Sequence, residues 1–197
     1  MLRDFFGRGP LLSAYILQKR YREASAFITP TTILDIGCGQ AYLADGMPTV
    51  ERYVGIDSHA LFLAQAAKRY PRHQFYQIDV EYEQLPAALE DATFESIMLI
   101  ALLEHLANPR HILALLSRYL TPTGRIVATT PTPWGHRVHS LGARLGFFYK
   151  EAADDHKTIF ERTSLTALFS GVGLDILHYS TFEFGCNQLI VASKAPA

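Results

Sequence analysis

The pattern of apolar and polar positions predicts strands that alternate with helices along most of the chain. Five runs are apolar almost throughout and rich in β-branched residues, as buried strands are. They cover Thr32 to Ile36, Tyr53 to Ile56, Phe75 to Ile78, Ile97 to Ala101 and Arg125 to Thr129. Helical periods lie between them, most clearly over Ala60 to Tyr70 and Pro109 to Leu120. This alternation indicates an α/β fold, a parallel sheet with helices on both faces.

The strand and helix alternation is preceded by a predicted helix and followed by a predicted pair of strands. An amphipathic helix is expected from Leu11 to about Phe27, within an N-terminal helical extension over residues 1–30. Near the other end, a helix at Ser164 to Ser170 precedes two strands, Asp175 to Phe182 and Gln188 to Ala192. The short linker between these strands fits a hairpin, and so an antiparallel edge on the sheet.

A long segment without a clear period connects the fifth strand to the last helix. It runs from Pro131 to Glu161 and is too long for a simple connection, so residues 131–162 are expected to form a substrate-side lid or insertion. Its aromatic residues, Trp134 among them, leave three interpretations open: a lid, a surface that touches a membrane or partner, or a helix packed on the sheet. No linker separates a second domain, so residues 1–197 are expected to form a single domain.

Composition limits the partners and the compartment. The 197 residues carry a formal net charge of −1, without the basic excess that drives sequence-independent nucleic-acid binding, so no nucleic-acid partner is expected. The two cysteines, Cys38 and Cys186, indicate a reducing cytoplasm, because Cys38 lies inside a glycine turn where a disulfide would obstruct the loop. The longest apolar run is too short to span a bilayer, so a cytoplasmic protein without stable membrane insertion is expected.

A glycine turn follows the first predicted strand, in the sequence ILDIGCGQAY at residues 33–42. Gly37 and Gly39 let the backbone approach a ligand closely, and Asp57 ends the second strand about twenty residues later. A carboxylate at that position suits the two hydroxyls of a ribose. A turn without a ligand is the alternative for the glycines alone, but both features together favour a ribose-bearing cofactor.

The residues around the turn distinguish between cofactors. Dinucleotide sites commonly have a small third residue below the pyrophosphate, where this chain has Tyr42. The acid Asp35 is a poor neighbour for a pyrophosphate and suits a ligand with an ammonium and a sulfonium. S-adenosylmethionine carries both groups and no phosphate. A nicotinamide-dependent oxidoreductase is the alternative that Tyr42 argues against.

From about Ile33 to Lys194, the chain resembles the class I S-adenosylmethionine-dependent methyltransferases. The matching stretches are ILDIGCGQAYL, YVGIDSH, YQIDVE, FESIMLIALLEHLANP, LTPTGRIVATTPTPWG and QLIVASK. The resemblance implies a Rossmann-like, doubly wound sheet of seven strands, mostly parallel with an antiparallel last strand. It also implies an enzyme that uses S-adenosylmethionine, although a cofactor-binding module without catalysis is a further alternative.

The resemblance implies a cofactor site built by the loops after the first four strands. In chain order, the expected residues are Asp35, Gly37 and Gly39 around the methionine part, Asp57 at the ribose with Ser58 and His59 beside the adenosine, Asp79 and Val80 at the adenine, and Ala101 and Leu102 along the channel to the methyl group. Some members of the family bind a metal through an acid-rich version of the stretch before Glu104 and His105. Ala101 removes such an acid here, so no metal is expected.

Three histidines are candidates for a general base, although a methyltransferase can act without one. They are His136 and His139, just after the fifth strand, and His156, before the last helix. His105 is expected to be structural, at the start of a helix. The acceptor is expected to be a small molecule, methylated at oxygen, with a sugar, glycolipid or quinone-type compound as the class. The sequence makes no prediction of the oligomeric state.

Overall fold

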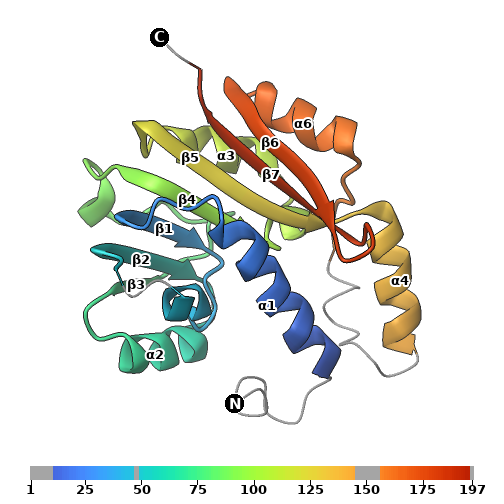
Figure 1. The fold of residues 1–197 in the computed structure, drawn as a ribbon. Helices are drawn as coiled ribbons and strands as arrows, with labels where there is room; N and C mark the ends of the chain where they lie inside the picture. The colour runs from blue at the N-terminus through green and yellow to red at the C-terminus, as the bar shows by residue number, and fades with distance from the viewer. Residues whose placement is uncertain (1–10, 47–48, 145–155, 196–197) are drawn as a thin grey trace.

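A seven-stranded sheet forms the centre of the molecule (Figure 1). The computed structural model describes residues 11–46, 49–144 and 156–195. The strand order is β3-β2-β1-β4-β5-β7-β6. The strands are β1 (Thr32–Ile36), β2 (Arg52–Asp57), β3 (Gln74–Gln77), β4 (Phe94–Ile100), β5 (Leu120–Pro131), β6 (Leu174–Phe182) and β7 (Asn187–Lys194). The order reverses between β1 and β4, the position where open α/β sheets bind ligands.

Helices cover both faces of this sheet. They are α1 (Leu11–Ser25), α2 (Ala60–Arg69), α3 (Pro109–Ser117), α4 (Pro133–Arg144) and α6 (Arg162–Ser170), with the short 3-10 helices η1 (Tyr42–Gly46), η2 (Ala87–Leu89) and η3 (Leu103–His105). Alternate strand residues enter two separate apolar clusters: Leu34 packs with residues of α3 and α6, whereas Ile33 packs with residues of α1 and α2. The period-2 alternation of side chains in a strand explains this division.

The strand directions confirm a mostly parallel sheet with an antiparallel last strand. β1 to β5 pair in parallel, and β7 runs antiparallel to both of its neighbours, β5 and β6. The antiparallel strand is therefore not the edge strand of the sheet, because β7 lies between β5 and β6. The edge strand β6 runs parallel to β5.

Two of the differences from the sequence prediction concern the chain after β4. The fifth strand begins at Leu120, which pairs with Phe94 of β4, so α3 ends earlier than predicted, at Ser117. The segment predicted to be irregular contains α4, whose first residue is Pro133, a residue that suits the first position of a helix. Residues 1–10 of the expected extension and 145–155 of the expected lid lie outside the described residues. Among the described residues, no helix has the length and apolar character needed to cross a bilayer.

Candidate functional site

The turn after β1 brings backbone rather than side chains to the carboxyl end of the sheet. Gly37 and Gly39 have φ angles of +74° and +53°, which glycine adopts without the strain that a side chain causes. A Cβ on Gly37 would lie 3.2 Å from the side chain of Leu102, so the loops after β1 and β4 pack closely. The N–H of Gly37 donates to the carbonyl of Ile56 at 2.8 Å, which fixes the turn against β2.

Asp57 ends β2 and joins its loop to the glycine turn. Its Oδ2 accepts a hydrogen bond from the N–H of Gly39, and its Oδ1 accepts one from the N–H of His59, each at 2.8 Å. The Asp57 side chain is only 11% exposed, so these bonds hold it in one orientation. Oδ1 also lies 3.3 Å from Nδ1 of His59. Each carboxylate oxygen has two acceptor positions, so Oδ2 can still accept a hydrogen bond from a ligand hydroxyl.

Asp35 lies below the turn, inside the sheet. It is 1% exposed, and the hydroxyl of Tyr53 donates a hydrogen bond to its Oδ2. Burial raises the pKa of this carboxyl to about 7, and the hydrogen bond from Tyr53 opposes the rise. Asp35 thus differs from the other expected cofactor residues, because it does not border the cavity they share. Its contact with the methionine part stays a prediction.

The loops after β3 and β4 supply the remaining expected positions. Asp79 is held in its loop by two hydrogen bonds: its N–H donates to Glu83 at 2.8 Å, and its Oδ1 accepts from the N–H of Glu81 at 3.1 Å. Ala101 has a φ of +54°, and its N–H donates to the carbonyl of Thr129 at 2.9 Å. The chain therefore turns sharply after β4, at the point where the sheet order reverses.

These loops enclose a cavity of about 1260 Å³. Apart from Asp35, all the expected cofactor residues border it: Gly37, Gly39, Asp57, Ser58, His59, Asp79, Val80, Ala101 and Leu102. Leu17 and Tyr21 of α1 border it as well, with His105 and Lys157. The cavity is large enough for a nucleoside with a methionine side chain, and Asp57 offers the acceptor oxygens that ribose hydroxyls require. The residues present therefore fit S-adenosylmethionine.

Three histidines from distant parts of the chain meet beside this cavity. The Nδ1 atoms of His136 and His156 lie 3.1 Å apart, a hydrogen-bond distance. The ring centroids of His105 and His156 are 5.0 Å apart, and those of His136 and His156 are 5.2 Å apart. The structure thus brings together two of the predicted base candidates, His136 and His156. It also adds His105, the last residue of η3 rather than the first of a longer helix.

The backbone of η3 holds His156 in place. The N–H groups of Lys157 and Thr158 both donate to the carbonyl of Glu104, at 2.8 and 3.1 Å. Lys157 also forms an ion pair with Glu81 at 2.6 Å. The segment that follows is fixed by Gln188 of β7, whose Nε2 donates to the carbonyl of Phe160 at 2.7 Å. The position of His156 therefore depends on backbone contacts that no spacing in the sequence indicates.

The helix that carries His136 and His139, α4, is fixed at its N-terminus. Thr132 precedes the helix, and its Oγ1 accepts a hydrogen bond from the N–H of Gly135 at 2.9 Å and donates to the carbonyl of Gly185 at 2.6 Å. This hydroxyl therefore caps α4 and attaches it to the turn between β6 and β7.

Charged residues surround the histidines on the side of α1. Arg20 donates through Nε to the Oδ1 of Asn187 at 2.9 Å. Glu104 is fully buried, which raises the pKa of its carboxyl, and Arg20 and His105 oppose that rise. Burial lowers the pKa of His139 and lowers that of His156 to about 4, and neighbouring positive groups add to both shifts. The lowered pKa values keep the imidazoles of His139 and His156 neutral at neutral pH.

Sequence reasoning missed Arg20 and assigned His105 to the framework. The position of His105 directly after the fourth strand was a usable signal, because the carboxyl ends of parallel strands meet at the ligand-binding edge. Arg20 had no such signal. It reaches the site only because α1 packs across the sheet, beside η1, β4, β5 and β7.

The fold and the cavity define a class of protein. A doubly wound sheet with an antiparallel β7, a glycine turn after β1 and a fixed acid after β2 belong to the Rossmann-like S-adenosylmethionine-dependent methyltransferases. The methyltransferase domain family matches residues 12–179, and the chain belongs to this family. S-adenosylmethionine is therefore its cofactor, and the alternative of a nicotinamide enzyme is set aside.

Relatives differ in what they act on. A tRNA U34 carboxymethyltransferase of Ectopseudomonas mendocina is 35% identical over 111 residues, which cover 52% of this chain and 33% of the relative. A ubiquinone biosynthesis O-methyltransferase of Xanthomonas oryzae is 25% identical over 138 residues, which cover 68% of this chain and 58% of the relative. The chain thus spans between a third and three fifths of these curated relatives.

A solved structure shows the same fold. The plantazolicin methyltransferase BpumL in complex with S-adenosylhomocysteine superimposes with a TM-score of 0.68 and 15% identity. The match covers 98% of this chain and 94% of that one. The likeness extends across almost the whole of both chains.

Proposed function

We propose that this chain transfers a methyl group to a hydroxyl oxygen of a small-molecule acceptor. The observation that carries the proposal is the convergence of His105, His136 and His156 beside the cofactor cavity. His105 borders that cavity together with Ala101 and Leu102, the residues we assign to the methyl channel, so an acceptor against the cluster would lie beside them.

The histidines supply what a hydroxyl acceptor needs. When bound, S-adenosylmethionine supplies a methyl group activated by its sulfonium. The acceptor oxygen forms the new O–C bond, the C–S bond breaks with its electron pair going to sulfur, and the hydroxyl proton passes to an imidazole. We assign the proton acceptor to the predicted set His136, His139 and His156. A positioned imidazole contributes about 10²- to 10⁴-fold to such a step, and the cavity walls contribute by aligning the reacting atoms.

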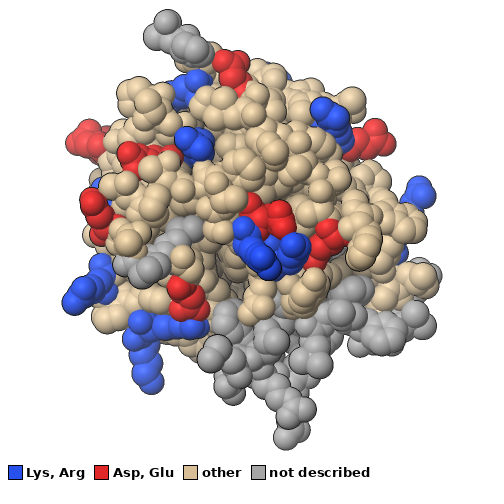
Figure 2. All heavy atoms as spheres, in the orientation of Figure 1, with Lys and Arg blue, Asp and Glu red and all other residues tan. Residues whose placement is uncertain are grey.

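Charge supports a small acceptor over a nucleic acid. Figure 2 shows acidic and basic side chains interspersed on the described part of the visible face, without a continuous basic surface there. The formal net charge is −1. The similarity to the ubiquinone O-methyltransferase favours oxygen, with a quinone-type phenol or a sugar or glycolipid hydroxyl as acceptor. The tRNA-modifying relative makes tRNA the acceptor that competes with this proposal.

We also propose the cytoplasm as the compartment and one domain as the organisation. Both cysteines are free thiols, which suits a reducing environment. The described part of the chain contributes all its strands to a single sheet.

Methyl-labelled cofactor tests the acceptor class. The protein is incubated with labelled S-adenosylmethionine and, separately, a dihydroxyphenol, a glycolipid extract and bulk tRNA. We expect the label in an O-methyl group of a small molecule, and label in tRNA alone would refute the proposal. His136→Ala and His139→Ala should lower transfer at least tenfold without changing S-adenosylhomocysteine binding. His111→Ala is the matched control, because His111 is exposed on α3.

A further inference from the structure

A buried carboxylate, that of Glu104, lies beside the histidine cluster. Glu104 is 0% exposed, and neither of its side-chain oxygens makes a hydrogen bond of ordinary geometry in the described part of the chain, although the hydroxyl of Thr130 lies near enough to oppose the rise in the pKa of the carboxyl. A buried carboxylate without hydrogen bonds loses its hydration without compensation, so such groups commonly bind a cation. Arg20 lies near Glu104, but its Nε is engaged by Asn187, which in turn donates to Glu183.

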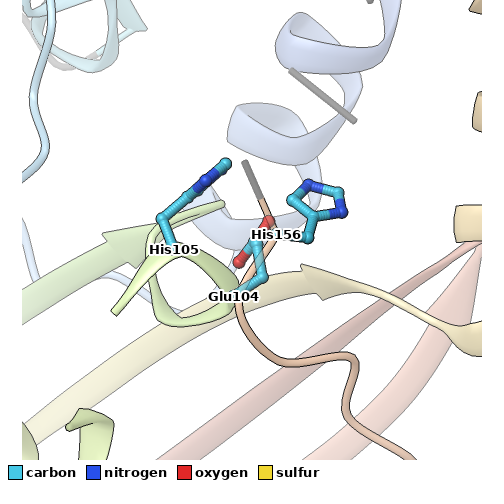
Figure 3. A group of neighbouring side chains, drawn as sticks. All are labelled: Glu104, His105 and His156. Carbon is cyan, nitrogen blue, oxygen red and sulfur yellow. The ribbon is translucent and has the colours of Figure 1, made fainter. Parts of the chain in front are cut away.

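Two imidazoles complete a compact set of metal ligands around this carboxylate. One ligand atom from each of Glu104, His105 and His156 lies within 4.8 Å of the others. In Figure 3, the Glu104 carboxylate lies between the two imidazole rings. Ligand atoms around an ion with bonds of about 2.1 Å are separated by about 3 to 4 Å, so small side-chain rotations suffice to bind one.

From this geometry we infer that Glu104, His105 and His156 form a binding site for a divalent transition metal. Two imidazoles and one carboxylate suit zinc and its neighbours better than calcium or magnesium, which prefer all-oxygen sites. Three protein ligands leave at least one coordination position open, as catalytic metal sites do. The absence of an acid at position 101 led the sequence to predict no metal, but His156 supplies a ligand from a part of the chain whose position only the fold reveals.

Contacts outside the ligand set hold these side chains ready. His136 Nδ1 lies 3.1 Å from His156 Nδ1, which leaves Nε2 of His156 for the ion. A metal-bound histidine usually has such a hydrogen bond on its other nitrogen. The Glu104 carbonyl accepts from Lys157 and Thr158, so the backbones that carry Glu104 and His156 are joined directly. The backbone that carries the ligands is therefore held in place without an ion, and only side-chain rotations remain.

The ion would act on the acceptor hydroxyl. His105 borders the cofactor cavity, so an ion held by these residues would lie beside the space where an acceptor binds. Such an ion would make a bound hydroxyl lose its proton more readily, and the proton would pass to a histidine outside the ligand set, His136 or His139. The oxygen then forms the O–C bond while the C–S bond breaks with its electrons going to sulfur. This role rests on the proposed function, whereas metal binding itself does not.

Titration of the full chain with zinc tests the site. Protein cleared of metal with a chelator is titrated with ZnCl₂ by calorimetry, and Co²⁺ absorption spectra report on the ligands. We expect one ion per chain in the wild type. His156→Ala and Glu104→Gln should weaken binding at least tenfold, and His111→Ala should not change it. A wild type that binds no zinc at saturation, or variants that bind as tightly as the wild type, would overturn the inference.

Two further measurements separate this inference from the proposed function. Binding of S-adenosylhomocysteine by each variant shows that the cofactor domain is folded. If the wild type methylates a hydroxyl acceptor at full rate in excess chelator and binds no zinc, the metal site is refuted and the proposed function stands. If it binds zinc through these ligands but labels only tRNA, the proposed function is refuted and the site stands.

Discussion

A Cβ on Gly135 would lie 1.7 Å from the carbonyl oxygen of Cys186. The first turn of α4 therefore rests directly on the turn between β6 and β7, with no space for a side chain. Thr132 reinforces the contact, because its hydroxyl bonds both to the N–H of Gly135 and to the carbonyl of Gly185. His136 follows Gly135 in the sequence, so this contact determines where the histidine lies.

Gly135→Ala should shift α4 and separate His136 from His156. We expect the free energy of unfolding to fall by about 1 to 3 kcal/mol, the range for overpacking a tight site. The rate of methyl transfer should fall by a larger factor than the affinity for S-adenosylhomocysteine, because no residue that the structure describes in α4 borders the cofactor cavity. Urea unfolding, calorimetry and label transfer measure the three quantities. The control is Gly46→Ala, whose Cβ meets nothing within 4 Å; equal results for both variants would contradict the role of this contact.

Asp57→Ala should weaken cofactor binding. The substitution removes the carboxylate that would accept hydrogen bonds from the ribose and releases the N–H groups of Gly39 and His59. Hydrogen bonds to charged groups contribute about 1.5 to 3 kcal/mol each, so affinity for S-adenosylhomocysteine should fall tenfold or more. Calorimetric titration gives the value. Asp91→Ala changes an exposed acid and should leave affinity as it is; the ribose assignment fails if the two variants bind alike.

The buried carboxyl of Asp35 should make stability depend on pH. Its pKa is raised to about 7 in the folded protein, so the folded state holds a proton that the unfolded chain releases at lower pH. The free energy of unfolding therefore decreases as pH rises toward 7, by about 3 kcal/mol between roughly pH 5 and pH 8.

Asp35→Asn isolates this contribution, because the amide oxygen can still accept from Tyr53 and carries no charge. The difference in the free energy of unfolding, variant minus wild type, should rise by about 3 kcal/mol over the same interval. Urea unfolding at both ends of the interval measures it. A difference that does not change with pH would show that Asp35 does not titrate in this range.

The sequence predicted the parts of the site that directly follow a recognisable strand in the chain. Asp57 and the two glycines follow buried strands whose apolar runs are plain in the sequence, and the parallel sheet places them at one edge. The histidine cluster depends instead on tertiary contacts. His156 is placed by hydrogen bonds to the Glu104 carbonyl, and α4 is placed by its contact with Cys186. Neither contact has a periodic or compositional signal, so the cluster emerges only from the fold.

Gln188 is the buried residue that connects the sheet to the segment carrying His156. It is 0% exposed, and its Nε2 donates to the carbonyls of Phe160 and Pro131, at 2.7 and 3.2 Å. Its Oε1 accepts from the hydroxyl of Tyr179 at 3.0 Å. Every polar atom of the amide is thus used in holding three segments together.

Gln188→Leu should leave these partners without hydrogen bonds while keeping a similar volume. Each buried group left unsatisfied costs about 1 to 3 kcal/mol, so the free energy of unfolding should fall by about 2 to 4 kcal/mol. Because Phe160 lies four residues after His156, the segment should loosen at the histidine cluster and methyl transfer should fall more than tenfold. Gln188→Glu is the informative comparison, since it keeps the acceptor for Tyr179 but loses the donor to Phe160. If Gln188→Glu transfers methyl groups like the wild type while Gln188→Leu does not, the hydrogen bond from Tyr179, and not the bond to Phe160, is what positions the site.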